Sequence, residues 1–131
     1  MTEHWDSLIQ QAIRARDNAY APYSNYKVGA ALLTTNGNIF VGCNVENASY
    51  GPSMCAERVA VFKAVSEGYK TFEAIAVVTV NGGTPCGVCR QVLREFAPNL
   101  IVVVSDVDSN HQVFTLADLL PHSFGPEHLP R

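Results

Sequence analysis

The sequence predicts an α/β fold, a three-layer α/β/α sandwich around a mixed, mostly parallel five-stranded sheet. Two observations carry this prediction. Short apolar runs of strand length alternate with stretches of helical period, and a hairpin signal, Thr35-Asn36-Gly37, separates the first two runs. A chain of 131 residues fits one domain, so we expect a single unit over residues 1–131.

The predicted elements follow one another with turn signals between them. Apolar residues at helical spacing from Trp5 to Ile13 indicate a first helix over about residues 3–18. We expect strands over residues 27–34, 38–43, 73–79 and 101–104. We expect further helices over residues 54–66 and 86–96, and a short one before Pro121. Both alternating faces of the first strand are small or apolar, so helices should cover both faces of the sheet.

Three cysteines are spaced as ligands of a catalytic zinc ion. Cys86 and Cys89 form a C-x-x-C pair at a predicted helix start, where positions i and i+3 lie on one face. Cys55 would supply a third sulfur from another helix start, with Ser53 as the expected N-cap. Helix N-termini favour the thiolate form that binds metal. Catalytic zinc sites use three protein ligands and leave the fourth position to water. We therefore predict one Zn²⁺ per chain, at the C-terminal edge of the sheet where both helices begin.

A glutamate follows the first cysteine at a spacing that suits a proton carrier. Glu57 lies two residues after Cys55, so on a helix it points in a different direction and can stand beside the ion. Three thiolates give the zinc site a net negative charge, which opposes acidification of bound water and calls for a general base. Arg58 is a candidate to offset that charge by donating a hydrogen bond to a ligand sulfur, and Arg90 is a second candidate.

Less specific interpretations of the cysteines stay open at this point. A C-x-x-C pair alone is typical of a redox dithiol or of half a structural zinc clip. The redox interpretation leaves Cys55 and Glu57 unexplained. A structural site, or a non-catalytic zinc-stabilised binding module, needs a fourth ligand. Cys43 is the only spare cysteine, and its place at the end of an apolar strand indicates a buried free thiol.

The motifs together resemble the small, homotetrameric, zinc-dependent cytidine deaminases. The resemblance runs through Pro22–Leu33, Gly42–Gly51, Cys55–Arg58, Pro85–Leu93, and Leu119–Pro121 with Phe124. The zinc-deaminase signature of a ligand, one residue, Glu, and later P-C-x-x-C is met with cysteine as the first ligand. The resemblance implies hydrolytic deamination of cytidine and deoxycytidine to uridine and deoxyuridine in pyrimidine salvage. It also implies a homotetramer whose pockets are completed by neighbouring subunits.

The same resemblance implies substrate-binding roles for six residues. Asn44 and Glu46 would bind the ribose hydroxyls, Ala48 would contact the base through its backbone, Tyr26 would stack on the base, and Tyr50 and Phe124 would reach the pocket of a neighbouring subunit. The family usually has Phe in place of Tyr26, and Gly51-Pro52-Ser53-Met54 also departs from its pattern. These departures keep open a deaminase of N4-substituted or modified cytosine nucleosides, or of a nucleoside antibiotic, and a polynucleotide cytosine deaminase is a third possibility.

Composition excludes several partner classes. The net charge of −3 argues against a nucleic-acid partner, because phosphate contacts dominate nucleic-acid affinity. No apolar run approaches the roughly 20 residues that span a bilayer. The polar start Thr2-Glu3-His4 does not resemble a signal peptide. Three cysteines assigned to metal suit a reducing compartment, so we expect a cytoplasmic protein with a small nucleoside as its partner.

Overall fold

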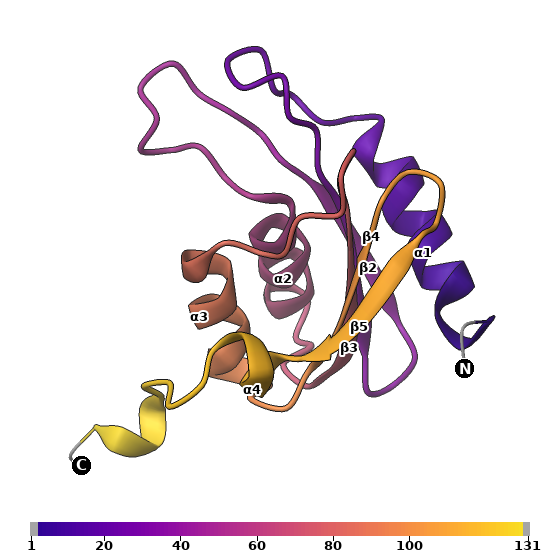
Figure 1. Ribbon diagram of the computed structural model, residues 1–131. Helices are drawn as coiled ribbons and strands as arrows, with labels where there is room; N and C mark the ends of the chain where they lie inside the picture. Colours follow the sequence, from indigo (N-terminus) through magenta and orange to yellow (C-terminus); the bar gives the residue numbers. More distant parts are fainter. Residues whose placement is uncertain (1–2, 130–131) are drawn as a thin grey trace.

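A computed structural model describes residues 3–129, in which a five-stranded sheet lies between two layers of helices (Figure 1). The elements in chain order are α1 (Glu3–Arg16), β1 (Gly29–Thr34), β2 (Ile39–Cys43), α2 (Ala56–Ser66), β3 (Phe72–Val78), α3 (Gly87–Phe96), β4 (Ile101–Ser105), β5 (His111–Thr115), α4 (Leu116–Leu119) and a 3₁₀ turn (Pro126–His128). The predicted α/β class, mixed sheet and five strands are confirmed, and the predicted strands and helices agree with the observed ones to within a few residues.

The strand directions correct one part of the prediction. The sheet order is β2-β1-β3-β4-β5, and among the described residues β3–β4 is the one parallel pair of neighbours. The expectation of a mostly parallel sheet was therefore wrong. The reason is topological: β1–β2 and β4–β5 are hairpins, and the α2 connection returns the chain on the far side of β1 rather than beside β2. As a result β2 and β3 run in the same direction with β1 between them.

The fifth strand begins at the end of the stretch 106–112, which the sequence had indicated as a polar loop, and continues to Thr115. His111–Thr115 pairs with β4 and forms one edge of the sheet, and all five of its residues are exposed or half-buried. An edge strand has a solvated side and needs no continuous apolar run. Its sequence therefore carried no strong strand signal.

Each face of the sheet packs against its own helical layer, because successive strand residues point to opposite faces. On β3, Ala74, Ala76 and Val78 pack with the apolar stripe of α1. Ile75 and Val77 face the other way and pack with α2 and α3. Figure 1 shows α1 on one side of the sheet and α2 and α3 on the other. The three-layer arrangement and the two covered faces are confirmed.

Two glycines let helices approach the hairpin backbone closely. A Cβ atom at Gly29 in β1 would lie 2.0 Å from the carbonyl oxygen of Ala12 in α1. A Cβ atom at Gly42 in β2 would lie 2.6 Å from the carbonyl oxygen of Ala56 and 2.7 Å from the backbone nitrogen of Ala60, both in α2. Neither contact leaves room for a side chain, so the hairpin is held between α1 and α2 through these two positions.

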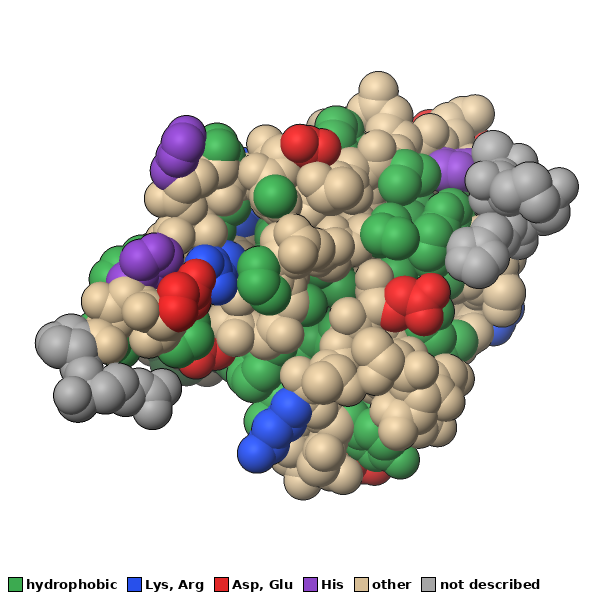
Figure 2. Space-filling view, turned by 90° about the horizontal axis from the view of Figure 1, so that it is seen from below, with side chains coloured by type: hydrophobic (Ala, Val, Ile, Leu, Met, Phe, Trp, Pro, Cys, Tyr) green, Lys and Arg blue, Asp and Glu red, His purple; other side chains and the backbone are tan. Residues whose placement is uncertain are grey.

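The surface carries charges of both signs without a concentrated basic region on the face that Figure 2 shows. Viewed from below, Lys and Arg side chains lie apart from one another, with acidic side chains between them (Figure 2). Several large apolar side chains are exposed, namely Tyr20, Tyr23, Val45, Tyr50, Phe62, Val80, Val88, Val113, Phe124 and Leu129.

Candidate active site

Three cysteine sulfurs meet where α2 and α3 begin. The Sγ atoms of Cys55, Cys86 and Cys89 all lie within 4.8 Å of one another. The Cys55–Cys86 separation is 3.9 Å and the Cys86–Cys89 separation is 3.4 Å. Because β2 and β3 run in the same direction, the helices that follow them both start at one edge of the sheet. The structure thus brings together the three predicted ligands at the predicted edge.

The local backbone explains how the first two sulfurs are presented. Cys55 and Cys86 are themselves the N-cap residues of α2 and α3, with extended backbone at φ −73°, ψ 152° and φ −69°, ψ 167°. The N-cap expected at Ser53 was wrong: its hydroxyl instead accepts a hydrogen bond of 2.9 Å from the Asn47 N–H. Cys89 follows in the first turn of α3, so two helix N-termini direct their partial positive charge at the sulfur cluster.

The donor set fits a catalytic zinc ion. The pKa of Cys55 is lowered to about 5, because Cys89 donates a hydrogen bond to its sulfur and Arg58 adds a second donor and a positive charge. Within residues 3–129, no fourth His, Cys, Asp or Glu joins the cluster, and Cys43 is a half-buried free thiol outside it. Three sulfurs and one open position are the arrangement of a catalytic rather than a structural zinc site.

Glu57 lies beside the cluster without being part of it. Its side chain is only 4% exposed, and it lines the same cavity as Cys55 and Cys86. Burial raises the pKa of Glu57 to about 7, and the negative charge of Cys55 adds to the effect. A carboxyl group with a pKa near neutrality can both accept and release a proton at the pH of the cell.

The two arginines of the motifs have different tasks. Arg58 Nη2 donates a hydrogen bond of 3.4 Å to the Cys55 sulfur, as expected. Arg90 does not take the alternative role suggested for it, because its guanidinium donates to the Pro85 carbonyl (2.8 Å), to the Thr84 hydroxyl (2.9 Å) and to the Leu119 carbonyl (2.7 Å). Arg90 therefore supports the segment that leads into α3 and its cysteines.

A cavity of about 250 Å³ opens next to the cluster. Its lining residues are Ser24, Tyr26, Val28, Asn44, Glu46, Cys55, Glu57, Val77, Thr79, Gly83, Thr84 and Cys86. Six of these were predicted site residues. Sequence reasoning assigned no role to Ser24, Val28, Val77, Thr79, Gly83 or Thr84. A signal existed for Ser24, which precedes Tyr26 by two residues and accepts a hydrogen bond from its N–H, as Ser does in turns.

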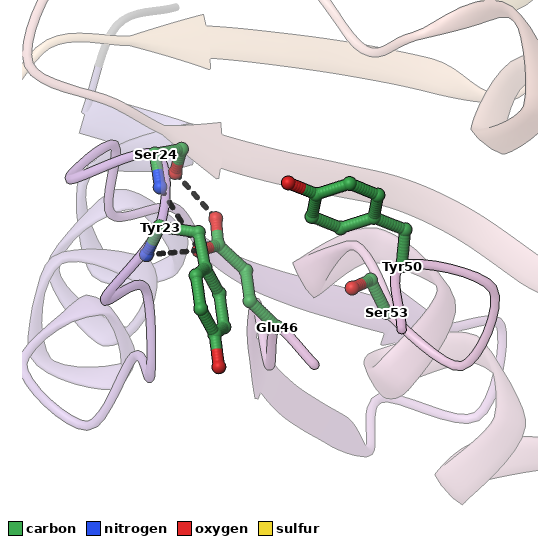
Figure 3. Close-up of a pocket in the computed structure, with 5 residues that line it drawn as sticks. All are labelled: Tyr23, Ser24, Glu46, Tyr50 and Ser53. Atoms are coloured by element: carbon green, nitrogen blue, oxygen red, sulfur yellow. Dashed lines mark hydrogen bonds between the residues drawn. The ribbon is translucent and has the colours of Figure 1, made fainter. Parts of the chain in front are cut away.

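Asn44 and Glu46 line the same cavity, and both already hold backbone groups. Asn44 Nδ2 donates to the Tyr26 carbonyl (2.8 Å), and Asn44 Oδ1 accepts from the Val28 N–H (2.9 Å). Glu46 Oε1 accepts from the N–H groups of Tyr23 (3.0 Å) and Ser24 (3.1 Å), and its Oε2 accepts from the Ser24 hydroxyl (Figure 3). The Ser24 hydroxyl is the main cause of the lowered pKa of Glu46.

These two side chains still have hydrogen-bonding capacity. A carboxylate offers about four lone-pair sites and an amide about four donor and acceptor sites, so one site on Glu46 and two on Asn44 remain. A second, more open cavity of about 390 Å³ shares Ser24 and Glu46 with the first. Its lining residues are Tyr23, Ser24, Glu46, Tyr50 and Ser53. Tyr50 points toward Glu46 across it (Figure 3).

Three of the six predicted substrate-binding residues lie outside the cavity beside the sulfur cluster. Ala48 is exposed on the segment between β2 and α2, and Tyr50 is 73% exposed on the same segment. Phe124 is 56% exposed on the C-terminal segment, where it stacks on His128 with 5.4 Å between ring centroids. A single chain does not bring these three to the cavity, and their expected contacts with the substrate or with a neighbouring subunit stay predictions.

Comparison with known proteins places the chain in a family. The family described as cytidine and deoxycytidylate deaminase zinc-binding region matches residues 2–105. The chain belongs to this family. Among the deaminases that it resembles, the cytidine deaminase of Halalkalibacterium halodurans is 49% identical over 123 residues, which is 92% of this chain and 93% of that protein. The cytidine deaminase of Sporosarcina psychrophila is 46% identical over 95% of this chain and 93% of that protein.

Solved structures of the family agree with the fold described above. The crystal structure of cytidine deaminase from Burkholderia pseudomallei is 53% identical, has a TM-score of 0.87, and is matched over 95% of this chain and 100% of that chain. Cytidine deaminase from Mycobacterium tuberculosis is 41% identical with a TM-score of 0.81, over 92% of this chain and 97% of that chain. The resemblance seen in separated motifs therefore extends to the arrangement of the whole sheet and its helices.

Proposed function

We propose that this family member is a zinc-dependent cytidine deaminase, which hydrolyses cytidine and deoxycytidine to uridine and deoxyuridine with release of ammonia. One observation carries the proposal: a buried carboxyl group with a pKa of about 7 stands beside three convergent sulfurs in a cavity of about 250 Å³. The named relatives, at 46–49% identity over nearly the whole chain, support the same activity. The 131 residues would act as one domain.

Zinc is the cofactor that the sulfur cluster fits. Held by Cys55, Cys86 and Cys89, the zinc ion would act as a Lewis acid that lowers the pKa of a coordinated water. Arg58 offsets the negative charge of three thiolates through its hydrogen bond to the Cys55 sulfur. The remaining steps belong to Glu57.

Glu57 moves two protons during the reaction. It accepts a proton from the attacking water and delivers it to N3 of the cytosine ring, while the new C–O bond forms at C4. It then carries the second proton from the C4 hydroxyl group to the amino nitrogen, and the C4–N bond breaks as ammonia leaves. Its raised pKa suits this exchange, because neither protonation state is strongly favoured near pH 7.

The lining of the cavity favours a nucleoside over a nucleotide or a nucleic acid. Among the described residues that line it, the charged side chains other than the cysteines are Glu46 and Glu57, and both are acidic. Phosphate groups are bound by Arg, Lys or free helix N-termini, whereas the N-termini of α2 and α3 already face the cysteine sulfurs. Neutral sugar hydroxyls instead suit the one free acceptor site of Glu46 and the two free sites of Asn44. We propose that these two bind the ribose and that Tyr26 contacts the base.

The same proposal includes an assembly and a cellular setting. Exposed aromatic residues such as Tyr50 and Phe124, together with Phe62 on α2 and Val88 on α3, support a homotetramer in which neighbours complete each pocket. No helix within residues 3–129 is both long enough and apolar enough to cross a membrane. Four free cysteines, three of them proposed ligands, support a reducing cytoplasm and a role in pyrimidine salvage.

A single preparation can test the function. The protein is purified under reducing conditions, its zinc content is measured, and loss of cytidine, deoxycytidine and cytidine 5′-monophosphate is followed by ultraviolet absorbance. We expect one zinc per chain, turnover of both nucleosides, and at least about tenfold weaker use of the monophosphate. Zinc-loaded protein that leaves both nucleosides unchanged would contradict the proposal. Light scattering on the same sample tests the tetramer, and an active monomer would contradict the roles of Tyr50 and Phe124.

A further inference from the structure

The hydroxyl group of Tyr26 is held by a residue that does not line the cavity. It donates a hydrogen bond of 2.6 Å to Asn81 Oδ1. Tyr26 belongs to the segment between α1 and β1, whereas Asn81 belongs to the segment between β3 and α3, 55 residues later. The bond therefore joins two irregular segments that contribute different walls of the same cavity.

Asn81 extends this connection to the cavity wall. Its Oδ1 atom also accepts a hydrogen bond of 3.3 Å from the Thr79 hydroxyl. The Thr79 hydroxyl oxygen in turn accepts from the Gly83 N–H at 2.9 Å. Thr79 is 3% exposed, and both Thr79 and Gly83 line the cavity. One amide oxygen thus links the Tyr26 hydroxyl to two residues of the opposite wall.

The two walls are in contact at the hydroxyl group. A Cβ atom at Gly83 would lie 3.1 Å from Tyr26 Oη and 3.6 Å from Asn81 Oδ1, so the Gly83 backbone lies directly against this pair. The main chain of Tyr26 is fixed as well, because its N–H donates to the Ser24 hydroxyl and its carbonyl accepts from Asn44. Tyr26, which lines the cavity, is therefore held both at its backbone and at its phenol oxygen.

The 79–84 segment leads directly to a sulfur of the cluster. At its far end, Thr84 and Pro85 are held by the Arg90 guanidinium, and Cys86 follows. At its other end, the segment is bonded to the α1–β1 segment through the hydrogen bond from the Tyr26 hydroxyl to Asn81. Loss of that bond would leave Gly83 held by Thr79 and the sulfur end held by Arg90, but would remove the side-chain bond that ties this segment to Tyr26.

We propose that Tyr26 is a positioning residue through its hydroxyl group. The bond to Asn81 holds the 79–84 segment against the aromatic ring, and so fixes the width of the slot that receives the cytosine ring. This inference rests on the proposed function and on the base lying beside Tyr26. The inference assigns two contributions to one side chain: the ring contacts the base, and the hydroxyl group holds the 79–84 segment in place.

The test compares Tyr26→Phe, Asn81→Ala, the double variant and Asn81→Asp, with Tyr69→Phe as a matched control away from the cavity. KM and kcat for cytidine, the inhibition constant of uridine, zinc content and melting temperature are measured for each. We expect Tyr26→Phe to raise KM and the uridine inhibition constant together by about 3–10-fold, the range of one lost hydrogen bond, with kcat within about twofold and zinc unchanged.

The other variants test whether Asn81 transmits the effect. Asn81→Ala should reproduce the change, and the double variant should be no worse than either single one, because all three lack the same bond. Asn81→Asp keeps an acceptor oxygen at this position and should keep KM within about twofold of the wild type. Tyr69→Phe should match the wild type.

Two results would overturn the inference. One is an unchanged KM and uridine inhibition constant in Tyr26→Phe, even if its melting temperature falls, because the hydroxyl would then be purely structural. The other is additive effects in the double variant, because Asn81 would then act independently. Both results require an active wild-type enzyme. Zinc-loaded wild type without cytidine turnover would instead contradict the proposed function.

Discussion

Two groups of residues at the cavity are built in opposite ways: the sulfur cluster with Glu57, here called the sulfur end, and the proposed ribose-binding pair Asn44 and Glu46, here called the sugar end. At the sulfur end, secondary structure positions the side chains: Cys55 and Cys86 cap two helices, and Glu57 is buried in the first turn of α2. At the sugar end, side chains position the backbone, because Asn44 and Glu46 hold the N–H and carbonyl groups of residues 23–28. Substitutions at the first end should therefore change the chemistry on an intact scaffold, and substitutions at the second should mainly weaken binding.

The largest expected effect is loss of the metal in Cys89→Ala. Cys89 is fully buried in α3, and the two sulfurs that remain offer too few ligands for a stable zinc site. We expect zinc to fall below about a tenth per chain and deamination to become undetectable, as measured by elemental analysis and ultraviolet assay. Cys43→Ala is the matched control, since Cys43 lies outside the cluster, and it should keep zinc and turnover. A Cys89→Ala protein with full zinc would refute the ligand assignment.

Glu57→Gln should abolish most turnover while leaving zinc in place. The amide has nearly the same size but cannot carry a proton, and general acid–base catalysis contributes about 10²–10⁴-fold in rate. We expect kcat to fall by about 10³-fold with one zinc per chain and KM changed by less than about threefold. Glu67→Gln, an exposed change at the other end of the same helix, is the control. Near-normal kcat in Glu57→Gln would exclude the proton-transfer role.

Glu46→Gln should affect binding rather than chemistry. The substitution removes the charge that the Tyr23 and Ser24 donors complement, and it weakens the acceptor proposed for a ribose hydroxyl. Hydrogen bonds to a charged group are stronger than those between neutral groups, so KM should rise about 10–100-fold and kcat much less. Steady-state kinetics beside the exposed Glu73→Gln control would measure this. A fall confined to kcat would contradict the contrast between the two ends.

Ser24→Ala is expected to have the smallest effect. It removes one of three donors to Glu46, so KM should rise by about 3–5-fold. The Ser24 hydroxyl lowers the pKa of Glu46, so this bond stabilises the fold above the ordinary glutamate pKa, and the benefit is lost as pH falls through the lowered value. The variant should therefore titrate Glu46 at a higher pH, nearer the ordinary value, in a carbon NMR titration of the carboxyl group. An unshifted titration would show that Ser24 does not stabilise the carboxylate.

The contrast between the two ends also explains what the sequence could predict. The cysteine and glutamate spacing is local, so the ligand cluster and the place of Glu57 beside it followed from two short motifs. The bonds from Tyr26 to Asn81 and from Ser24 to Glu46 join segments that are distant in sequence, and no local pattern marks them. Helix α1 was also placed correctly, because its helical period of apolar residues is a local pattern.

The fold was predictable to a similar extent. Alternating apolar runs and the Asn36-Gly37 turn located four strands and the layers around them. The strand His111–Thr115 was missed because a solvated edge has little apolar content, and the strand directions were misjudged because pairing depends on which side of β1 the chain returns. Both errors concern tertiary choices that local patterns leave undetermined.

The close contact at Gly42 makes the placement of Glu57 beside the sulfur cluster sensitive to a position 13 residues before Cys55. Helix α2 rests its backbone on that glycine and carries Cys55 and Glu57 at its leading end, while the other two sulfurs belong to α3. A methyl group added at Gly42 would push α2 away from the hairpin. The Glu57 carboxyl group would then shift relative to the sulfurs of Cys86 and Cys89. An enzyme of this design depends on the absence of a side chain in its scaffold as much as on the groups that react.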